Sequence, residues 1–262
     1  NSAYNIIRTS DKETEYLYYY EFLSTIANAG WYPTYAFPAT FVADYPDAVA
    51  YSITCAVYNP NSKLLKIYDE ADDLRIQEKQ FFFTTWNGLP LLKPKAGQAP
   101  STKKFPYFFL EEEALTTGLA GKSRTIYRSA LMYLTFAEAD VVSKNQVTPK
   151  AIDALATIQA RASMSKTKEQ IAASLGTLSV NEFVEEVWRE RIREFVLENK
   201  IWNDITRTLK YPNIDSDNID FVNLVGATNP FGKKFQEKDL TYPYPRSEYD
   251  RNPNLKLDPI TQ

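Results

Sequence analysis

Four charged residues in the second half of the chain are of the types that acid–base chemistry uses. Carboxylates can act as general acids or bases, and neighbouring guanidinium groups can shift their pKa. The four residues are Glu190, Arg191, Arg193 and Glu194. On a helix, however, Glu190 lies three and four positions from Arg193 and Glu194, which is the spacing of an ordinary charged face with ion pairs. We therefore interpret the cluster as structural rather than catalytic.

A second pair of carboxylates, Glu138 and Asp140, lies in a mostly apolar segment. We expect Glu138 to accept hydrogen bonds from the backbone or from an arginine. Nothing in the sequence marks the two as a glycosidase pair. The chain has no histidine and a single cysteine, Cys55, which excludes Ser-His-Asp and Cys-His relays, histidine–zinc sites and multi-cysteine metal sites. We expect no catalytic residue, no cofactor and no metal ligand, so the protein is predicted not to be an enzyme.

Aromatic side chains in proline-bounded loops indicate a different chemistry, the binding of a sugar. Sugar rings have flat C–H faces that stack on aromatic planes, and a loop that is ordered before binding loses little entropy. The first loop carries Trp31, Tyr32, Tyr35 and Phe37 beside Pro33 and Pro38. The predicted glycan platform is formed or bordered by Trp31, Tyr32, Tyr35 and Trp86, with Asn87 or Asp44 supplying hydrogen bonds. Alternatively, these rings simply cover the core beneath long loops.

The composition is that of a globular protein with a substantial core. Of the 262 residues, 44% are hydrophobic and 24% are charged, which excludes intrinsic disorder. The net charge of −3 disfavours binding to nucleic acid, which normally needs a basic excess. No apolar run approaches the ~20 residues that span a bilayer.

The elements that position these residues are clearest in the second half. The segment 125–142 is apolar almost all round, which predicts a helix buried among other helices. Thr148 and Pro149 then provide an N-cap and a proline at the first helical position, and the helix they begin has an apolar stripe through 152–162. Two antiparallel helices of this combined length resemble the ~34-residue unit of tetratricopeptide-like repeats.

A longer helix is predicted from about Val180 to Leu209. Ser179 and Glu182 form a capping box before it, and its apolar positions recur three or four residues apart. The aromatic residues on this stripe, which we expect in the core, are Trp188, Phe195 and Trp202. We expect the two-helix unit 126–163 to pack against it.

The rest of the chain is less regular. The segment 16–26 has helical spacing but is also rich in aromatic residues that favour strands, so both alternatives stay open. Prolines and glycines cluster at 31–41 and 86–106, which indicates loops. From Tyr211 onward the chain is rich in Pro, Asn and Asp, and an irregular coil is expected.

Four segments resemble, in the correct order, motifs of the SusD/RagB family of outer-membrane nutrient-binding lipoproteins. Residues 190–207, ERIREFVLENKIWNDITR, are similar to that family's E-R-x-R-E-F-x-x-E-G-x-R-W-x-D-L-x-R signature. The other three are TIYRSALMYLTFAEA (125–139), AIDALATIQARAS (151–163) and YPYPRSEYDRNPNL (242–255). Looser matches are GWYPTYAFPATFVADYP (30–46) and DDLR (72–75). The chain departs from the signature at Asn199, Ile201 and Asn203, where glycine, arginine and an aromatic residue are usual.

The resemblance implies a mainly α fold of tetratricopeptide-like helix pairs with long irregular loops and few short strands. It covers the C-terminal half of such proteins, which are roughly twice this length. Within it we expect a loop-rich ligand face at 1–124, a helical region at 125–210 and an irregular tail at 211–262.

The resemblance also implies a function. Family members bind oligosaccharides, or in some cases peptides, without catalysis, and deliver them to a SusC-like TonB-dependent transporter. They are held on the extracellular face of the outer membrane by a lipid anchor near the N-terminus, which this chain does not contain. The alternative is a helical-repeat scaffold that binds a peptide or protein. Neither reading involves nucleic acid.

Overall fold

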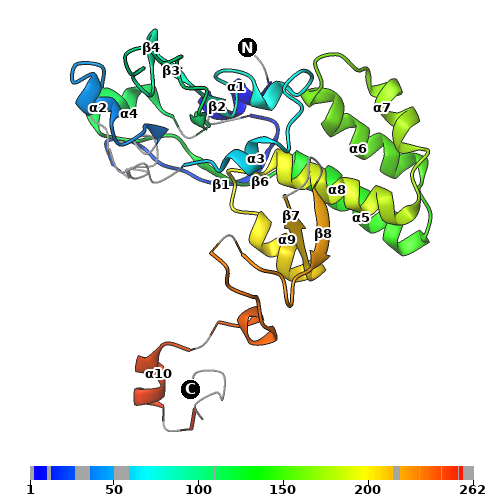
Figure 1. The fold of residues 1–262 in the computed structure, drawn as a ribbon. Helices are drawn as coiled ribbons and strands as arrows, with labels where there is room; N and C mark the ends of the chain where they lie inside the picture. Colours follow the sequence, from blue (N-terminus) through cyan, green and yellow to red (C-terminus); the bar gives the residue numbers. More distant parts are fainter. Residues whose placement is uncertain are drawn as a thin grey trace. The chain divides into compact units, whose positions relative to one another are not determined.

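The computed structural model describes residues 3–10, 13–26, 36–49, 59–108, 110–214, 219–229, 231–242, 244–252 and 254–255. The chain divides into two compact units, residues 1–199 and 200–262. Figure 1 shows a group of packed helices at the end of the first unit, after a region of loops and short strands. In the described ranges, no helix is both long enough and apolar enough to cross a membrane.

The helical part of the first unit contains α5 (Ser129–Lys144), α6 (Pro149–Ala162), α7 (Lys168–Leu175) and α8 (Val180–Glu194). α5 packs against both α6 and α8, and α6 packs against α7 (Figure 1). Their apolar stripes meet in one core, which includes Leu134, Val141, Leu155, Ile158, Ile171, Leu175, Phe183 and Val187. The mainly α fold is therefore confirmed, as is the packing of the two-helix unit against the helix that begins at Val180.

The starts of these helices follow from their capping residues. The Thr148 side chain accepts a hydrogen bond from the Ala151 N–H, and Pro149 follows it as predicted. The predicted capping box of Ser179 and Glu182 is present at the start of α8. α7 has no counterpart among the predicted elements, although Thr167 begins it with a capping box of its own.

The helix predicted over 125–142 begins later than expected. Residues Arg124–Arg128 form strand β6, which pairs antiparallel with β1 (Tyr16–Tyr20). This pairing also decides the open alternative at 16–26 in favour of a strand. Tyr16 lies opposite Arg128, and Tyr20 lies opposite Arg124. Thr125, Ile126 and Tyr127 have high strand propensity, so tertiary pairing overrides the helical pattern here.

The remainder of the first unit is a loop-rich region held by very short strand pairs. β2 (Phe82–Phe83) pairs with β5 (Phe105–Pro106), and β3 (Thr85–Trp86) pairs with β4 (Leu89–Pro90). Short helices add to it: α1 (Ala3–Thr9), α2 (Phe41–Asp44), α3 (Ser62–Leu65), the 3₁₀ turn η2 (Leu74–Ile76) and α4 (Glu112–Thr117). A second, mostly aromatic core joins α2, α4 and the short strands β2 to β5; its members include Phe37, Phe41, Phe83, Trp86, Phe105 and Tyr107.

The long helix predicted from Val180 to Leu209 is instead two helices. α8 ends at Glu194, and α9 (Ile201–Thr208) begins after an interruption in which Asn199 has a φ of +57°. This left-handed conformation favours glycine and tolerates asparagine, and it cannot be continued as a helix. Of the three aromatic residues expected in the core, Phe195 is buried and Trp188 packs partly against the core. The prediction that Trp202 lies in the core is wrong, because 39% of its surface is exposed.

The second unit contains α9 and a two-stranded antiparallel ribbon of β7 (Lys210–Asn213) and β8 (Asp220–Asn223). The ring of Trp202 lies 6.2 Å from that of Phe235, between centroids. The tail from Tyr211, expected to be irregular throughout, therefore begins with a regular ribbon. It continues through a 3₁₀ turn, η3 (Glu237–Leu240), and a short helix, α10 (Arg246–Arg251).

The charged cluster of α8 is structural, as predicted, but it is not on an exposed face. Glu190 and Glu194 are 1% and 0% exposed. The buried Arg75 donates from Nη1 to Glu190 at 2.7 Å and to Glu194 at 3.0 Å, while its Nη2 donates to Asp73 at 2.7 Å. Charges taken out of water need such partners, and here arginines from other segments provide them.

Glu194 is the centre of this buried network. It accepts hydrogen bonds from Arg128, Arg161, Arg75 and the Tyr4 hydroxyl. Burial by itself raises the pKa of Glu194, but the guanidinium groups of Arg128, Arg161 and Arg75 outweigh this effect and lower that pKa to about 2. The network therefore ties α1, η2, β6 and α6 to α8.

Candidate functional site

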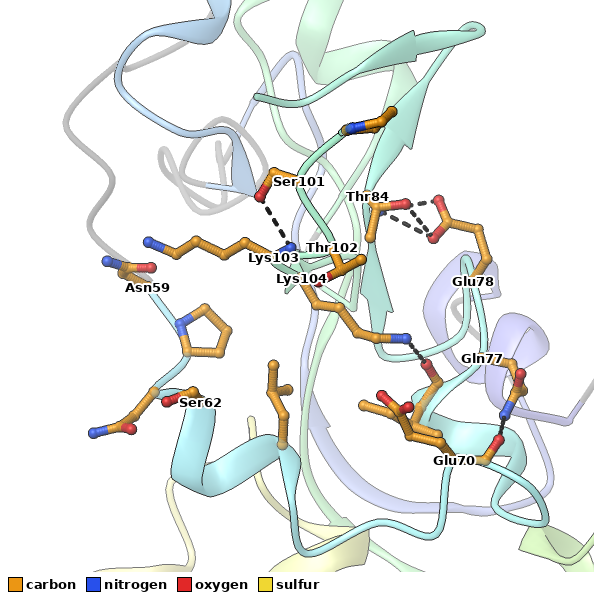
Figure 2. A pocket seen from close by; sticks show the side chains of 15 residues that line it. Asn59, Ser62, Glu70, Gln77, Glu78, Thr84, Ser101, Thr102, Lys103 and Lys104 are labelled. Carbon is orange, nitrogen blue, oxygen red and sulfur yellow. Dashed lines mark hydrogen bonds between the residues drawn. The ribbon is translucent and has the colours of Figure 1, made fainter. Parts of the chain in front are cut away.

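A large polar cavity in the loop-rich region is the best candidate site of the described residues. Its volume is about 1180 Å³. One wall consists of residues from 59–65, the opposite wall consists of 100–104, and residues between Glu70 and Thr84 complete it (Figure 2). The cavity is somewhat larger than the pockets that usually hold small ligands, so several linked units of a ligand can fit.

The Glu78 side chain fixes one part of the cavity. Its carboxylate accepts hydrogen bonds from both the N–H and the hydroxyl of Thr84, at 3.0 and 2.9 Å (Figure 2). It also accepts from the N–H and the hydroxyl of Thr85, each at 3.1 Å. The four donors hold the segment before β2 against the start of β3, so this carboxylate is already satisfied within the protein.

The segment 100–104 is anchored beside it. The Lys104 ammonium donates to the Ile76 carbonyl at 2.8 Å, and the Lys103 N–H donates to the Ser101 hydroxyl at 3.2 Å. Pairing of β2 with β5 brings 100–104 to the same place as residues 76–84. Gln77 is oriented by its amide, which donates to the Glu70 and Asp73 carbonyls at 2.9 and 3.1 Å.

The opposite wall begins at Asn59 and continues into α3. The Asn61 side chain caps this helix by accepting from the Lys63 N–H at 2.9 Å. Pro60 and Leu65 add apolar surface between the polar side chains of Asn59 and Ser62. The cavity thus combines amides, hydroxyls, two lysines and two glutamates with a similar extent of apolar surface, which suits a ligand that has both hydroxyl groups and C–H faces.

Of the predicted site residues, Trp31, Tyr32 and Tyr35 lie outside the described residues. Asp44 is the last residue of α2 and is half-buried. None of the predicted residues is among those that line the cavity.

Trp86 lies in the aromatic core and is 8% exposed. Its ring makes an edge contact with Phe37, at 5.8 Å between centroids. This burial leaves little of the indole face for a sugar to stack on, so at this position the structure favours the alternative that the ring belongs to the core.

Asn87 and Gly88 form a tight turn between β3 and β4, with φ angles of +47° and +78°. An Asn-Gly pair between short strands is the usual signal of a two-residue hairpin, and the sequence predicted only a loop here. The Asn87 residue is exposed. The positive φ that this turn requires explains why asparagine stands at position 87.

The carboxylates considered for chemistry have structural contacts. Glu138 accepts a hydrogen bond from the Trp188 indole N–H at 2.9 Å. Asp140 accepts from Lys144 at 2.6 Å and from the Thr148 hydroxyl, which lower its pKa. Among the described residues, no group of three or more His, Cys, Asp or Glu side chains is arranged to hold a metal ion.

Comparison with known proteins places these features in a family. The SusD family model matches residues 47–259. Among solved structures, a SusD superfamily protein from Parabacteroides distasonis is 25% identical, with a TM-score of 0.77 over 98% of this chain and 52% of that one. No curated protein matches the chain.

Two further structures share the fold at lower identity. The surface glycan-binding protein A of Bacteroides uniformis is 17% identical, with a TM-score of 0.64 over 97% of this chain and 51% of that one. The protein of the same name from Bacteroides thetaiotaomicron, in complex with laminarihexaose, is 15% identical, with a TM-score of 0.61 over 95% and 53%. The chain spans about half the length of the structures it matches.

Proposed function

The chain belongs to the SusD family, and from this premise we propose that it binds an oligosaccharide, without catalysis, in the cavity between residues 59–65 and 100–104. The observation that carries the proposal is the cavity itself, with its volume of about 1180 Å³ and its mixture of amides, hydroxyls and charged groups. Sugar hydroxyls need both donors and acceptors, and this lining offers both.

The fixed geometry of the cavity supports the same proposal. The carboxylate of Glu78 and the ammonium of Lys104 hold the backbone of two wall segments in place. A site that is ordered before the ligand arrives loses less entropy on binding.

The proposal also covers the cellular location of the protein and its transporter partner. We infer that the protein works on the extracellular face of the outer membrane, held by a lipid anchor, and passes its ligand to a SusC-like TonB-dependent transporter. The support is the family resemblance of four motifs together with the family match over 47–259. Two structural neighbours are surface glycan-binding proteins, one of them solved with a bound hexasaccharide.

The aromatic platform remains part of the proposal as a second contact region. Trp31, Tyr32 and Tyr35 would stack on the glycan, and Asp44 or Asn87 would bond its hydroxyls. Asp44 and Asn87 each adjoin the aromatic core that contains Phe37, because α2 and the β3–β4 hairpin both pack on it.

A second function, peptide or protein binding, is favoured by one observation. A hollow of about 560 Å³ on α5 and α6 is lined mainly by apolar side chains. Met132, Tyr133 and Phe136 line it and are 47%, 43% and 44% exposed. An exposed apolar patch of this kind is typical of surfaces that another polypeptide covers. This surface is separate from the polar cavity, so the two functions have different residues to test.

Calorimetry on the full-length protein tests the proposed function. The Asn59→Ala/Thr102→Ala double variant removes an amide and a hydroxyl from opposite walls of the cavity. We expect it to weaken oligosaccharide binding at least severalfold, because each ligand hydrogen bond contributes about 1 kcal/mol. The matched control is Asn181→Ala on the exposed surface of α8, which should bind as the wild type does. Equal affinities for all three proteins would contradict the cavity as the binding site.

A further inference from the structure

The wall 100–104 of the polar cavity ends in two adjacent lysines, Lys103 and Lys104, in a chain whose net charge is negative. The full sequence has 30 basic and 33 acidic residues, for a net charge of −3. Four charged residues line the cavity: Lys103 and Lys104 on the wall 100–104, and Glu70 and Glu78 on the segment that completes it. The walls 59–65 and 100–104 themselves contain neither aspartate nor glutamate. Two adjacent ammonium groups on one wall attract ligands of negative charge.

The acidic residues near the cavity are mostly committed to other partners. Glu78 accepts four hydrogen bonds from Thr84 and Thr85. Asp73 forms an ion pair with the buried Arg75 at 2.7 Å. Asp72 accepts from the Ser163 hydroxyl and from the Met164 and Ser165 N–H groups. Arg75 offsets the charge of Asp73. Glu78 keeps its negative charge, but neutral donors of Thr84 and Thr85 occupy its oxygens, and Glu70 is the other acidic residue of the lining.

The ammonium groups of the two lysines that line the cavity have fewer protein partners than the Glu78 carboxylate. Lys104 is half-buried, and its ammonium uses one of its three donors on the Ile76 carbonyl (Figure 2). The Lys103 ammonium lies 5.6 Å from the centroid of the Phe105 ring. In the part of the chain that the structure describes, neither ammonium contacts a carboxylate. Both have donors available for a ligand anion.

We propose that this cavity selects an anionic oligosaccharide, one whose sugar units carry carboxylate or sulfate groups. The inference rests on the proposed function and specifies its ligand class. Lys103 and Lys104 would bind the acidic groups, and the amides and hydroxyls of the opposite wall would bind sugar hydroxyls. Charge-assisted hydrogen bonds are the stronger of these contacts, so they decide between charged and neutral glycans of similar shape.

The test compares a charged ligand with a neutral one of the same backbone, and adds a sulfated ligand of a different backbone. Hexagalacturonate carries carboxylates, its methyl ester is neutral, and a κ-carrageenan hexasaccharide carries sulfates instead. Calorimetry on the full-length protein is expected to show that one anionic ligand binds at least about tenfold more tightly than the methyl ester at low salt. High salt should remove most of this difference, because exposed charges are screened. The anionic ligand that binds more tightly shows whether the cavity recognises carboxylate or sulfate groups.

Variants connect the selectivity to the two lysines. Lys103→Gln and Lys104→Gln are each expected to weaken anionic binding about two- to fivefold, the range for partly exposed charge pairs. Lys104→Arg keeps the charge and should retain the affinity. Lys238→Gln, on the exposed surface of η3, removes the same charge elsewhere and should have no effect. Thermal melts of all four variants establish that folding is unchanged.

The outcomes separate this inference from the function it rests on. If the methyl ester or laminarihexaose binds as tightly as the charged ligands, the anionic class is overturned and oligosaccharide binding stands. If the two glutamine variants bind the anion as the wild type does, the lysines are not its site, and the inference is equally overturned. If no saccharide binds, the proposed function fails together with the inference.

Discussion

Arg128 on β6 and Glu194 on α8 form a buried ion pair in which Nη1 donates to Oε1 at 2.6 Å. Arg128 also donates from Nη2 to the carbonyl of the same residue at 2.9 Å. The two side chains are 2% and 0% exposed. Because β6 pairs with β1 and α8 packs on α5, this one contact joins the ribbon to the helical core.

Removing the acidic partner should destabilise the protein severely. Glu194→Ala leaves the buried Arg75 and Arg128 with fewer partners, and breaking a buried pair in this way costs about 3–5 kcal/mol. The measurement is the free energy of unfolding in urea. Glu185→Ala on the same helix removes a more exposed pair with Arg189 and should cost at most about 1 kcal/mol. Similar losses in the two variants would argue against a special role for the buried network.

The same carboxylate should make stability depend on pH in the acid range. The pKa of Glu194 is lowered in the folded state, to about 2 from an ordinary value of 4.5. The unfolded chain therefore takes up the proton first, and the stabilisation is complete above about pH 5 and disappears as the pH falls towards about pH 2. We expect this group to contribute on the order of 3 kcal/mol. In Glu194→Gln the decline of unfolding free energy with falling pH should be smaller; an identical decline would contradict the assignment.

The break after α8 predicts a simple result at Asn199. With a φ of +57°, this position suits glycine, the residue usual at this place in the family signature. Asn199→Gly should leave the melting temperature unchanged or raise it. Asn199→Ala should lower the stability by about 1 kcal/mol, because alanine is strained in this conformation. If the alanine variant melts no lower than the glycine variant, the left-handed conformation is not present in solution.

The sequence predicted the helical part best because its signals are local. The N-caps Thr148 and Ser179 mark helix starts with their own side chains, and the apolar stripes of α6 and α8 follow a strict period. The errors have a different origin. Tyr16–Tyr20 and Arg124–Arg128 become strands only because they pair with each other across about a hundred residues. The pattern of 180–209 stays periodic through the interruption at Asn199, so periodicity alone could not reveal the break.

The cavity could not be predicted from local sequence signals either, because pairing between distant segments brings its walls together. Its walls come from 59–65 and 100–104, which the sequence shows only as two polar, proline-containing stretches. The pairing of Phe82–Phe83 with Phe105–Pro106 brings the second stretch to residues 76–84. The excess of lysine in 93–104 was the one available signal, and it marks a site only once its position is known. Large aromatic residues drew attention first, and Trp86 shows that such a ring in a loop can serve the core.

The two tryptophans of the platform predicted from the sequence should respond differently to truncation. Trp86 is buried in the aromatic core against Phe37, so Trp86→Ala should cost about 3–5 kcal/mol and lower the melting temperature by several degrees. Trp31 lies outside the described residues, and if it stacks on the glycan as predicted, Trp31→Ala should weaken binding about fivefold with no change in melting temperature. Calorimetry and thermal melts of the full-length protein measure both effects. Normal binding by Trp31→Ala would exclude its ring from the platform, and a lowered melting temperature would assign that ring to the core as well.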